Sequence, residues 1–389
     1  MRYEEITMGE KQYKIVYCTP ALYMAGGVER VLTLKANYFA EYYGYDITII
    51  LTEGKEKPLF YPLSDKIKVI NLDINFEELW TCSIIKKVFV YLKKQRIYKK
   101  KLSEELMRLR PDITISLLRR EINFINDIQD GSKKIGELHI NRSHYRNFEG
   151  KESSPLKKVF SKLWMKSLVT KLKRLDSFVV LTEKDREAWT ELDNVNVIPN
   201  PLSFIPTQKS ALTEKRVIAV GRYCHEKGYD DLLQAWKLIE QSCQDWRLEI
   251  YGDGNRTPYE QLINELQIDC NRCILHGRTK DIEQEYINSS FAVCSSRFEG
   301  FGLTIIEAMA CGLPVVSFDC PWGPQSIIEN NENGILVENG NIEKLANSIM
   351  MLMNDGGQRL KMGDNAIKSV NRFRIENIAQ KWLSLFCGI

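Results

Sequence analysis

Residues 295–314 read SSRFEGFGLTIIEAMACGLP, and this stretch decides the class of fold. The apolar run Phe291–Cys294 before it predicts a strand, and Gly300 and Gly302 predict a loop that opens into a helix near Leu303–Thr304. A strand joined to a helix in this way is the repeating unit of a parallel sheet covered by helices. The unpaired N–H groups at the start of the helix point at the strand end, where they favour a diphosphate.

The same alternation of short β-rich runs and longer amphipathic stretches extends along the chain. A first series of strands is expected at Tyr13–Cys18, Asp46–Leu51, Ile67–Asn71, Asp112–Leu117, Lys134–Ile140 and Ser177–Leu181. A second series is expected at Arg216–Val220, Arg247–Gly252, Cys273–His276, Phe291–Ser295, Pro314–Ser317 and Gly334–Val337. Between them, the three prolines of VIPNPLSFIP (197–206) disfavour helix and sheet and predict a linker. The sequence thus predicts an α/β protein with two Rossmann-like doubly wound domains facing each other across a cleft.

The composition of the 389 residues, 44% hydrophobic and 27% charged, is typical of a soluble globular protein. No apolar run is long enough to span a bilayer, and the polar, acidic N-terminus differs from a secretory signal, so we expect a cytoplasmic location. The ten cysteines are scattered singly and are interpreted as reduced core thiols. Cys270 and Cys273 lack a second pair at zinc-like spacing and are interpreted as structural.

Basic residues are concentrated in the first half, where residues 1–200 contain 35 Lys and Arg against 27 Asp and Glu. Segment 84–101 (IIKKVFVYLKKQRIYKKK) carries eight Lys or Arg, segment 157–174 (KKVFSKLWMKSLVTKLKR) carries seven, and neither contains an acidic residue. No nucleic-acid recognition motif accompanies them, and large apolar residues are interleaved with the charges. We therefore expect an anionic membrane surface as a partner and no nucleic acid; ordinary solvated helix faces are the alternative.

Two carboxylates flank the expected diphosphate-binding site. Glu299 lies in the loop before the helix and Glu307 inside the helix, with seven residues between them. Carboxylates accept hydrogen bonds from hydroxyl groups, so a sugar and a ribose are suitable partners on either side of the phosphates. In the simpler interpretation, Glu299 is a solvated loop residue and Glu307 is a charge that the helix dipole favours. The glycines and the nearby strand end favour a ligand site instead.

The stretch EGFGLTIIEAMACGLPVV (299–316) resembles the signature of the retaining glycosyltransferases of family 4, of the bacterial surface-polysaccharide type. Similar stretches are GGVER at 26–30, GRYCHEKG at 221–228 and GPQSIIENNENGILV at 323–337. The resemblance implies the GT-B fold, with an acceptor-side domain at 1–203 and a nucleotide-sugar donor domain at 204–370. It also implies that a C-terminal helix, about 371–389, packs back on the first domain.

The resemblance assigns roles to individual residues. Arg222 and Lys227 follow an expected strand end, where two cations neutralise a diphosphate as it departs, and the matching residues of the family hold the donor phosphates. With Glu299 and a histidine they form the expected catalytic group, and no metal ion or other cofactor is implied. Further donor contacts are expected from Gly26, Gly27, Gly300, Phe301, Gly302, Leu303, Thr304 and Glu307.

Two of the four histidines, His139 and His144, lie at or just after the expected strand Lys134–Ile140. A histidine at such a strand end can contact the transferred sugar or assist the acceptor hydroxyl. The ELH of residues 137–139 resembles the family's histidine more closely, so we prefer His139 and keep His144 as the alternative on the acceptor side.

The expected activity is the retaining transfer of a hexose or N-acetylhexosamine to a saccharide acceptor, lipid-linked, in surface polysaccharide synthesis. Bacterial enzymes that resemble this chain commonly use UDP-sugars, which favours UDP in the donor. The protein is expected to be peripheral on the inner face of the cytoplasmic membrane. A nucleotide-sugar epimerase on the same fold and a non-catalytic nucleotide-sugar-binding protein are the alternatives; the latter could dispense with Glu299, Arg222 or Lys227.

Overall fold

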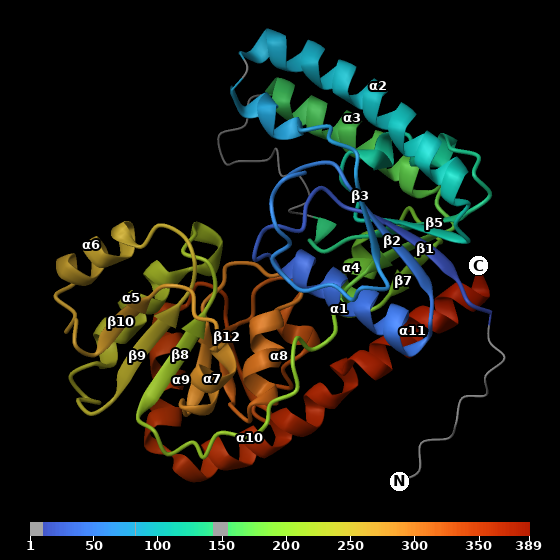
Figure 1. Cartoon of the computed structure of the whole chain (residues 1–389). Helices are drawn as coiled ribbons and strands as arrows, with labels where there is room; N and C mark the ends of the chain where they lie inside the picture. Colours follow the sequence, from blue (N-terminus) through green and yellow to red (C-terminus); the bar gives the residue numbers. More distant parts are fainter. Residues whose placement is uncertain (1–10, 82, 143–154) are drawn as a thin grey trace. The chain divides into compact units, whose positions relative to one another are not determined.

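The computed structural model describes residues 11–81, 83–142 and 155–389, which form two compact units (Figure 1). The first unit comprises Met1–Val180, Arg186–Ile198 and Ala379–Ile389, and the second comprises Leu181–Asp185 and Pro199–Ile378. Each unit contains one parallel sheet covered by helices, so the predicted class of fold, two α/β domains, is confirmed.

In the described part of the first unit, seven strands form a parallel sheet of order β3-β2-β1-β4-β5-β6-β7. The strands are β1 (Lys14–Cys18), β2 (Asp46–Leu51), β3 (Lys68–Asn71), β4 (Ile113–Ser116), β5 (Lys133–Glu137), β6 (Ser177–Val180) and β7 (Val195–Val197). The sequences DITIIL of β2 and ITIS of β4 are rich in β-branched residues and almost wholly buried, as expected for strands with helices on both faces.

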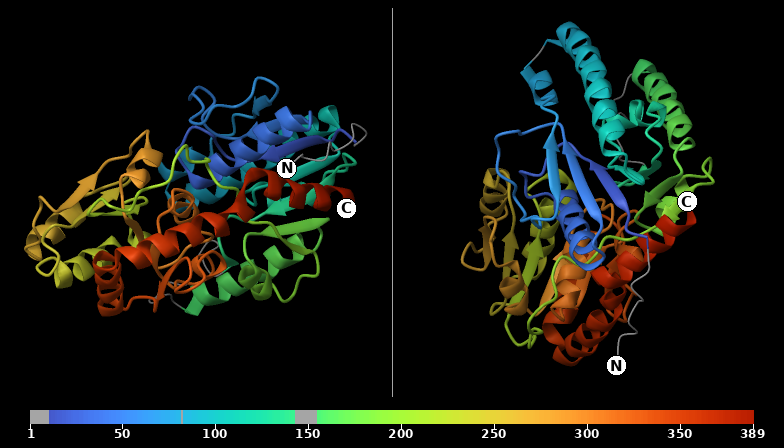
Figure 2. Two further views of the ribbon diagram at one scale, coloured as in Figure 1. Left: turned by 90° about the horizontal axis from the view of Figure 1, so that it is seen from below. Right: turned by 45° about the vertical axis from the view of Figure 1, so that its right-hand side comes forward.

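The principal helices of the first unit are α1 (Gly27–Tyr42), α2 (Ile84–Leu109) and α3 (Pro155–Leu172), and α4 (Glu183–Ala188) spans a change of unit. Figures 1 and 2 show α2 and α3 on one side of the first sheet. Asp127 connects them, because its carboxylate pairs with Lys99 of α2 at 3.2 Å and with Arg174, just after α3, at 2.9 Å.

The last helix, α11 (Ile375–Gly388), has most of its length in the first unit. Its buried Trp382 and Phe386 pack there, and the ring of Phe386 lies 5.7 Å from that of Phe39 in α1. The hydroxyl of Tyr13 donates a hydrogen bond to the carbonyl of Phe386 at 3.3 Å. The C-terminal residues therefore complete the hydrophobic core of a domain built from the start of the chain.

The described strands of the second unit form a six-stranded parallel sheet of order β10-β9-β8-β11-β12-β13. They are β8 (Arg216–Val220), β9 (Arg247–Tyr251), β10 (Cys273–His276), β11 (Phe291–Cys294), β12 (Val315–Phe318) and β13 (Gly334–Val337). The helices are α5 (Tyr229–Ile239), α6 (Thr257–Glu265), α7 (Ile282–Ile287), α8 (Leu303–Ala310), α9 (Ile342–Asn354) and α10 (Gly356–Val370). Because all strands run parallel, the loops that follow them leave the sheet at one edge.

Candidate active site

The candidate donor site lies at this edge of the second sheet, in the loops after β8, β11 and β12. Glu299 and Trp322, which belong to two of these loops, form a parallel β-bridge. A side chain at Gly323 would collide with the backbone of Phe301, so glycine permits the close approach. The glycine loop before α8 is thus held against the loop after β12.

Helix α8 begins at Leu303, as the sequence predicts. Gly302 directly before it has a φ of 108°, a backbone conformation that favours glycine. Leu303 and Thr304 are half-buried at the helix start. The side chain of Phe301 is buried and its ring lies 5.3 Å from that of Phe373, so this residue can offer only its backbone to a ligand.

Lys227 and Glu299 meet at the centre of the candidate site. The ammonium of Lys227 lies 2.5 Å from Oε1 of Glu299, and the hydroxyl of Ser296 donates a hydrogen bond to the same oxygen at 2.7 Å. The side chains of Lys227 and Glu299 are only 19% and 13% exposed. Burial lowers the pKa of Lys227, but the neighbouring groups together, led by the Glu299 carboxylate, raise it above its usual value. The lysine is therefore a cation at neutral pH.

The loops that carry these two residues are joined by further contacts. The hydroxyl of Ser295 donates to the carbonyl of Lys227 at 2.9 Å, and the backbone N–H of Arg297 donates to the carbonyl of Glu226 at 2.9 Å. The guanidinium of Arg297 pairs with Asp230 and Asp231 at the start of α5, at 2.6 and 2.8 Å. The sequence did not single out Arg297, because nothing in its neighbourhood reveals partners so distant along the chain.

Two other predicted donor residues have different surroundings. Arg222 is exposed, directly after Gly221, and its guanidinium takes part in no ion pair with the rest of the described residues. Glu307 lies inside α8 and is 3% exposed. Arg222 is thus open to a ligand, whereas Glu307 is enclosed by the protein.

The remaining predicted residues belong to the first unit. Gly27 is the first residue of α1, and Gly26 caps the helix. Gly26 has an extended backbone with a φ of −90°, and an added Cβ would collide with the side chain of Glu29. Because the obstacle is the far end of a flexible side chain, which can move, neither the packing nor the backbone angle requires glycine at this position.

His139 follows β5, which ends at Glu137 and is shorter than the strand Lys134–Ile140 expected from the sequence. Its side chain is 7% exposed, and its Nε2 lies 3.2 Å from Oε1 of Glu137. His144, the alternative, lies outside the described residues. The structure therefore groups Lys227 and Glu299 with the glycine loop in the second unit, and places His139 and the two glycines of α1 in the first.

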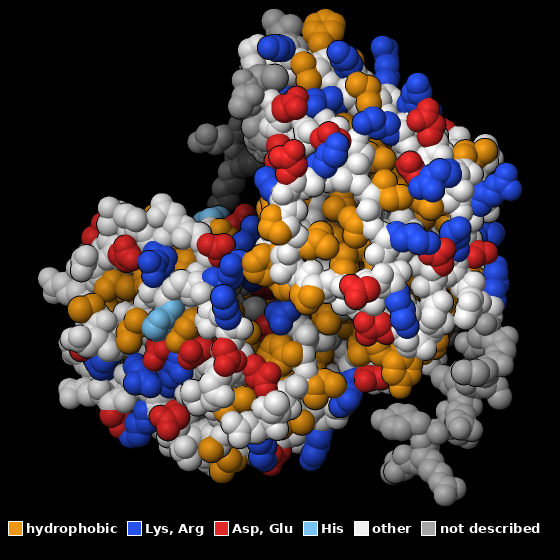
Figure 3. Space-filling model, in the orientation of Figure 1, with side chains coloured by type: hydrophobic (Ala, Val, Ile, Leu, Met, Phe, Trp, Pro, Cys, Tyr) orange, Lys and Arg blue, Asp and Glu red, His pale blue; other side chains and the backbone are white. Residues whose placement is uncertain are grey.

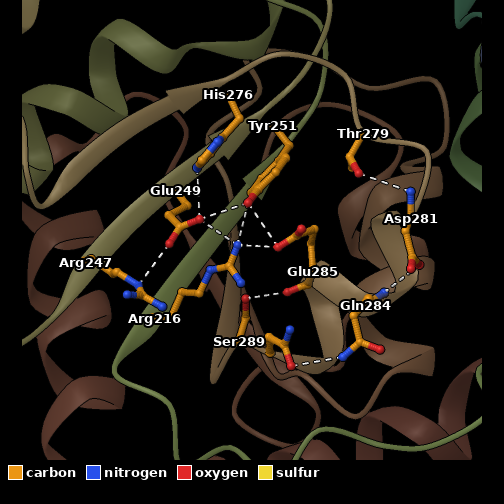
Figure 4. Close-up of polar contacts among 11 residues, drawn as sticks. Arg216, Arg247, Glu249, Tyr251, His276, Thr279, Asp281, Gln284, Glu285 and Ser289 are labelled. Carbon is orange, nitrogen blue, oxygen red and sulfur yellow. Dashed lines mark hydrogen bonds and ion pairs between the residues drawn. The ribbon is translucent and has the colours of Figure 1, made fainter.

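A second polar cluster of the second unit, which sequence reasoning missed, lies between the sheet and α7 (Figure 4). Arg216 donates hydrogen bonds to Glu249, Tyr251 and Glu285, each at 2.6 Å. Glu249 also lies 2.9 Å from Nε2 of His276, and burial raises the pKa of Tyr251. Arg216 is the first residue of β8, whereas the donor loop follows the last residue of that strand, so the cluster lies at the other end of the strand from the donor loop. Its contact with Glu285 anchors α7 to the sheet.

In the parts of the chain that the structure describes, no group of three or more His, Cys, Asp or Glu side chains could hold a metal ion. No helix there is both long enough and apolar enough to cross a membrane.

Comparison with known proteins places this geometry in context. Residues 204–369 match the family model described as glycosyl transferases group 1. An uncharacterized glycosyltransferase of Haemophilus influenzae is 32% identical, over 92% of this chain and 95% of the relative. The poly(ribitol-phosphate) alpha-N-acetylglucosaminyltransferase of Staphylococcus aureus is 30% identical, over 67% of this chain and 52% of the relative.

Among solved structures, the chain is similar to TarM of S. aureus, crystallised with UDP and alpha-GlcNAc-glycerol. The TM-score is 0.75 over 96% of this chain and 99% of TarM, at 18% sequence identity. This likeness concerns the fold.

Proposed function

The chain belongs to the group 1 glycosyltransferases, and on this premise we propose that it transfers a hexose or N-acetylhexosamine from a UDP-sugar to a saccharide acceptor. The pair Lys227 and Glu299, set beside the glycine loop of α8, carries the proposal. It offers a cation for a diphosphate and a carboxylate for sugar hydroxyls within one site. UDP is favoured because TarM was crystallised with it, and surface polysaccharide synthesis because the Staphylococcus relative is named for a poly(ribitol-phosphate) substrate.

In the proposed reaction, Lys227 and Arg222 bind the donor phosphates and neutralise the charge that develops on the leaving nucleotide. Glu299 accepts hydrogen bonds from the sugar, and His139 contacts the transferred sugar or assists the acceptor hydroxyl. The ribose is assigned to Glu307 on the resemblance to family 4, although the side chain is only 3% exposed. These groups handle the diphosphate without a divalent ion, so we propose metal-independent transfer.

We also propose that the anomeric configuration is retained, as in the resembling family 4. No carboxylate is assigned as a nucleophile on the far face of the sugar. Attack on the face that the nucleotide leaves, assisted by the departing phosphate, is therefore the mechanism we favour.

We propose a lipid-linked acceptor and an anionic membrane surface as partners, and the basic helices of the first unit support this proposal. On α2, Val88, Phe89 and Leu92 are exposed, and the side chain of Phe89 is 70% accessible. Exposed lysines accompany them, and Figure 3 shows blue and orange side chains intermingled over α2 at the top of the view. Apolar groups among cations suit the interface of an anionic bilayer, here the inner face of the cytoplasmic membrane.

The basic surface is smaller than the sequence alone suggests. The ammonium of Lys94 lies 2.9 Å from Glu78 and donates to the carbonyl of Ile74, and that of Lys101 donates to the carbonyl of Leu72. Both lysines bind their own unit. The cations near Phe89, such as Lys86 and Lys93, are those that we expect to face lipid.

A donor panel tests the proposed activity. The purified protein is incubated with UDP-linked and other nucleotide sugars, with and without a lipid-linked saccharide, and the products are resolved by chromatography. We expect a saccharide product with one donor sugar, with turnover unchanged by EDTA. Interconversion of the donor sugar without transfer indicates an epimerase, and binding without turnover indicates a non-catalytic protein.

Glu299→Gln supplies the matching variant. It keeps the shape of the side chain but removes the charge, and we expect turnover to fall by about 10²-fold or more. Glu338→Gln, an exposed glutamate of the same unit, is the control. Near wild-type turnover in a folded Glu299→Gln protein contradicts the donor-site assignment.

A further inference from the structure

A guanidinium group joins the two segments that carry Lys227 and Glu299 without using either of these side chains. Arg297, in the loop after β11, donates hydrogen bonds to both carboxylate oxygens of Asp230 in the first turn of α5, at 2.9 and 2.6 Å. Its Nη2 also lies 2.8 Å from Oδ2 of Asp231. The contact with Asp230 is bidentate, which is the geometry in which arginine and a carboxylate bind each other most strongly.

Arg297 holds the segment of Lys227 at points on both sides of that residue. Nη1 of Arg297 donates to the carbonyl of His225, which precedes Lys227, at 2.7 Å, and the bidentate partner Asp230 follows Lys227 in the chain. Arg297 itself belongs to the loop that carries Glu299. One side chain therefore ties the backbone around the lysine to the backbone around the glutamate.

The groups in this contact are charged and only partly open to water. The side chain of Arg297 is 24% exposed, and those of Asp230 and Asp231 are 38% and 15% exposed. Burial raises the pKa of Asp230, but its neighbours, led by Arg297, bring it below its usual value, so this carboxylate is ionised at neutral pH. Partly buried ion pairs are screened by salt less than pairs on an open surface, so this contact can hold the two segments together.

The direct link between the two segments is lost in the proposed reaction. The ammonium of Lys227 binds the diphosphate and the carboxylate of Glu299 binds the sugar, so the ion pair between them has to open. The hydrogen bond from Ser296 to Glu299 lies within one loop and does not join the two segments. The contacts of Arg297 use neither the lysine nor the glutamate side chain, and they can persist while the donor is bound.

We propose that Arg297 is a positioning residue that keeps Lys227 and Glu299 at the separation that the donor needs once their own ion pair has opened. The inference rests on the proposed function, because the donor is what opens the pair. In the free protein, the ion pair and the Arg297 contact are two links between the same segments. The loss of either link alone is therefore tolerated there, whereas the loss of both is not.

Hydrogen exchange tests this redundancy without a donor. Lys227→Met removes the ion pair, and Arg297→Lys keeps the positive charge but removes the bidentate contact. Exchange of the backbone N–H groups of residues 296–302 is followed by mass spectrometry in the wild type, the two single variants and the double variant. This segment includes the N–H of Arg297, which donates to the carbonyl of Glu226 at 2.9 Å. We expect exchange to rise by at most about twofold in each single variant and by about tenfold or more in the double variant.

Transfer kinetics report on the donor-bound state, in which the ion pair is open. We expect Arg297→Lys to lower kcat/KM for the donor by about tenfold or more, because displaced reacting groups slow the reaction.

Arg272→Lys is the matched control. The side chain of Arg272 is 20% exposed, pairs with Asp269 at 3.2 Å and donates to the carbonyl of Glu240 at 2.9 Å. It directly precedes β10, so it lies at the opposite edge of the sheet from the donor loops. We expect this variant to melt a few degrees lower, as Arg297→Lys does, and to leave kcat/KM and the exchange of residues 296–302 unchanged.

The proposal is wrong if the double variant exchanges no faster than the single variants, or if either single variant exchanges as fast as the double variant. If the double variant does not fold, Lys227→Met alone decides, because fast exchange there shows that Arg297 does not hold the segments. Wild-type kcat/KM in folded Arg297→Lys also overturns the proposal. If the donor panel fails while the exchange results hold, the proposed function is wrong and the two redundant links stand.

Discussion

Gly228 is the position at which one added methyl group should disturb the donor site most. It has a φ of 59°, which favours glycine, and it ends the loop that carries Lys227. A Cβ at Gly228 would lie closer than 3.0 Å to the carbonyl oxygen of Ser295, a separation that Cβ atoms essentially never show. The obstacle is backbone and cannot rotate away. Gly228→Ala must therefore push the Ser295 loop, which carries Glu299, away from Lys227.

The size of the effect follows from this geometry. An ordinary contact between a carbon and an oxygen requires the two loops to separate by roughly 1 Å. A misplacement of that size at reacting groups costs about 10²-fold in rate, and the left-handed backbone costs about 1–2 kcal/mol of stability. We expect Gly228→Ala to lower kcat/KM for the donor by about 10²-fold while the melting temperature falls by only a few degrees.

Gly131→Ala is the matched control, because Gly131 has a φ of 85° and an added Cβ there meets nothing within 4 Å. It carries the same kind of backbone strain without the collision. We expect a similar loss of stability and unchanged kcat/KM. The reasoning fails if Gly228→Ala keeps wild-type kcat/KM, or if Gly131→Ala loses as much activity as Gly228→Ala.

Three further predictions concern the other features of the molecule. Lys227→Met should lower turnover by about 10²-fold or more, because it removes a cation from the donor phosphates. Glu307→Gln should mainly raise the donor KM, because a ribose contact is made in ground and transition states alike, and steady-state kinetics separates the two patterns. Arg142 chiefly holds the pKa of Glu191 at about 2, below its ordinary 4.5. The extra stability of the wild type over Glu191→Gln should therefore be full above pH 4.5 and disappear as the pH falls to about 2. If the ion pair contributes nothing, the melting temperatures of the two proteins will differ by the same amount across that range. Phe89→Ser should weaken sedimentation with anionic vesicles without affecting transfer to a soluble acceptor, and equal recovery with neutral vesicles would rule out the membrane proposal.

The sequence predicts the strands well wherever an apolar run is bounded by turn residues. Cys273–His276 and Gly334–Val337 have the predicted bounds in the structure. The short edge strand Val195–Val197 was missed, since it precedes a proline-rich stretch and its three residues are too few for a periodic pattern. Strand β5 ends before Ile140 because the apolar pattern continues beyond the last residue that pairs in the sheet.

The candidate site was predictable where its residues are close together in the sequence, and not where they come from distant parts of the chain. The glycines, the helix start and Glu299 lie within one short stretch, so their spacing indicates a common site. Contacts between residues that are far apart in the sequence leave no comparable spacing pattern. Nothing near Arg297 indicates Asp230, and nothing near Lys35 indicates Glu137, although each pair is fixed by the parallel order of the strands.

Each unit contains a lysine–glutamate pair near the carboxyl end of a strand, and their exposure separates their roles. Lys227 and Glu299 remain 19% and 13% exposed, so a diphosphate can reach the ammonium and release the carboxylate for sugar hydroxyls. The side chains of Lys35 and Glu137 are 2% and 3% exposed, and Trp382 covers the lysine. No ligand can compete for that pair without displacing α11. The more accessible pair is thus suited to exchange its partner during a catalytic cycle, whereas the buried pair is suited to hold α1 against β5.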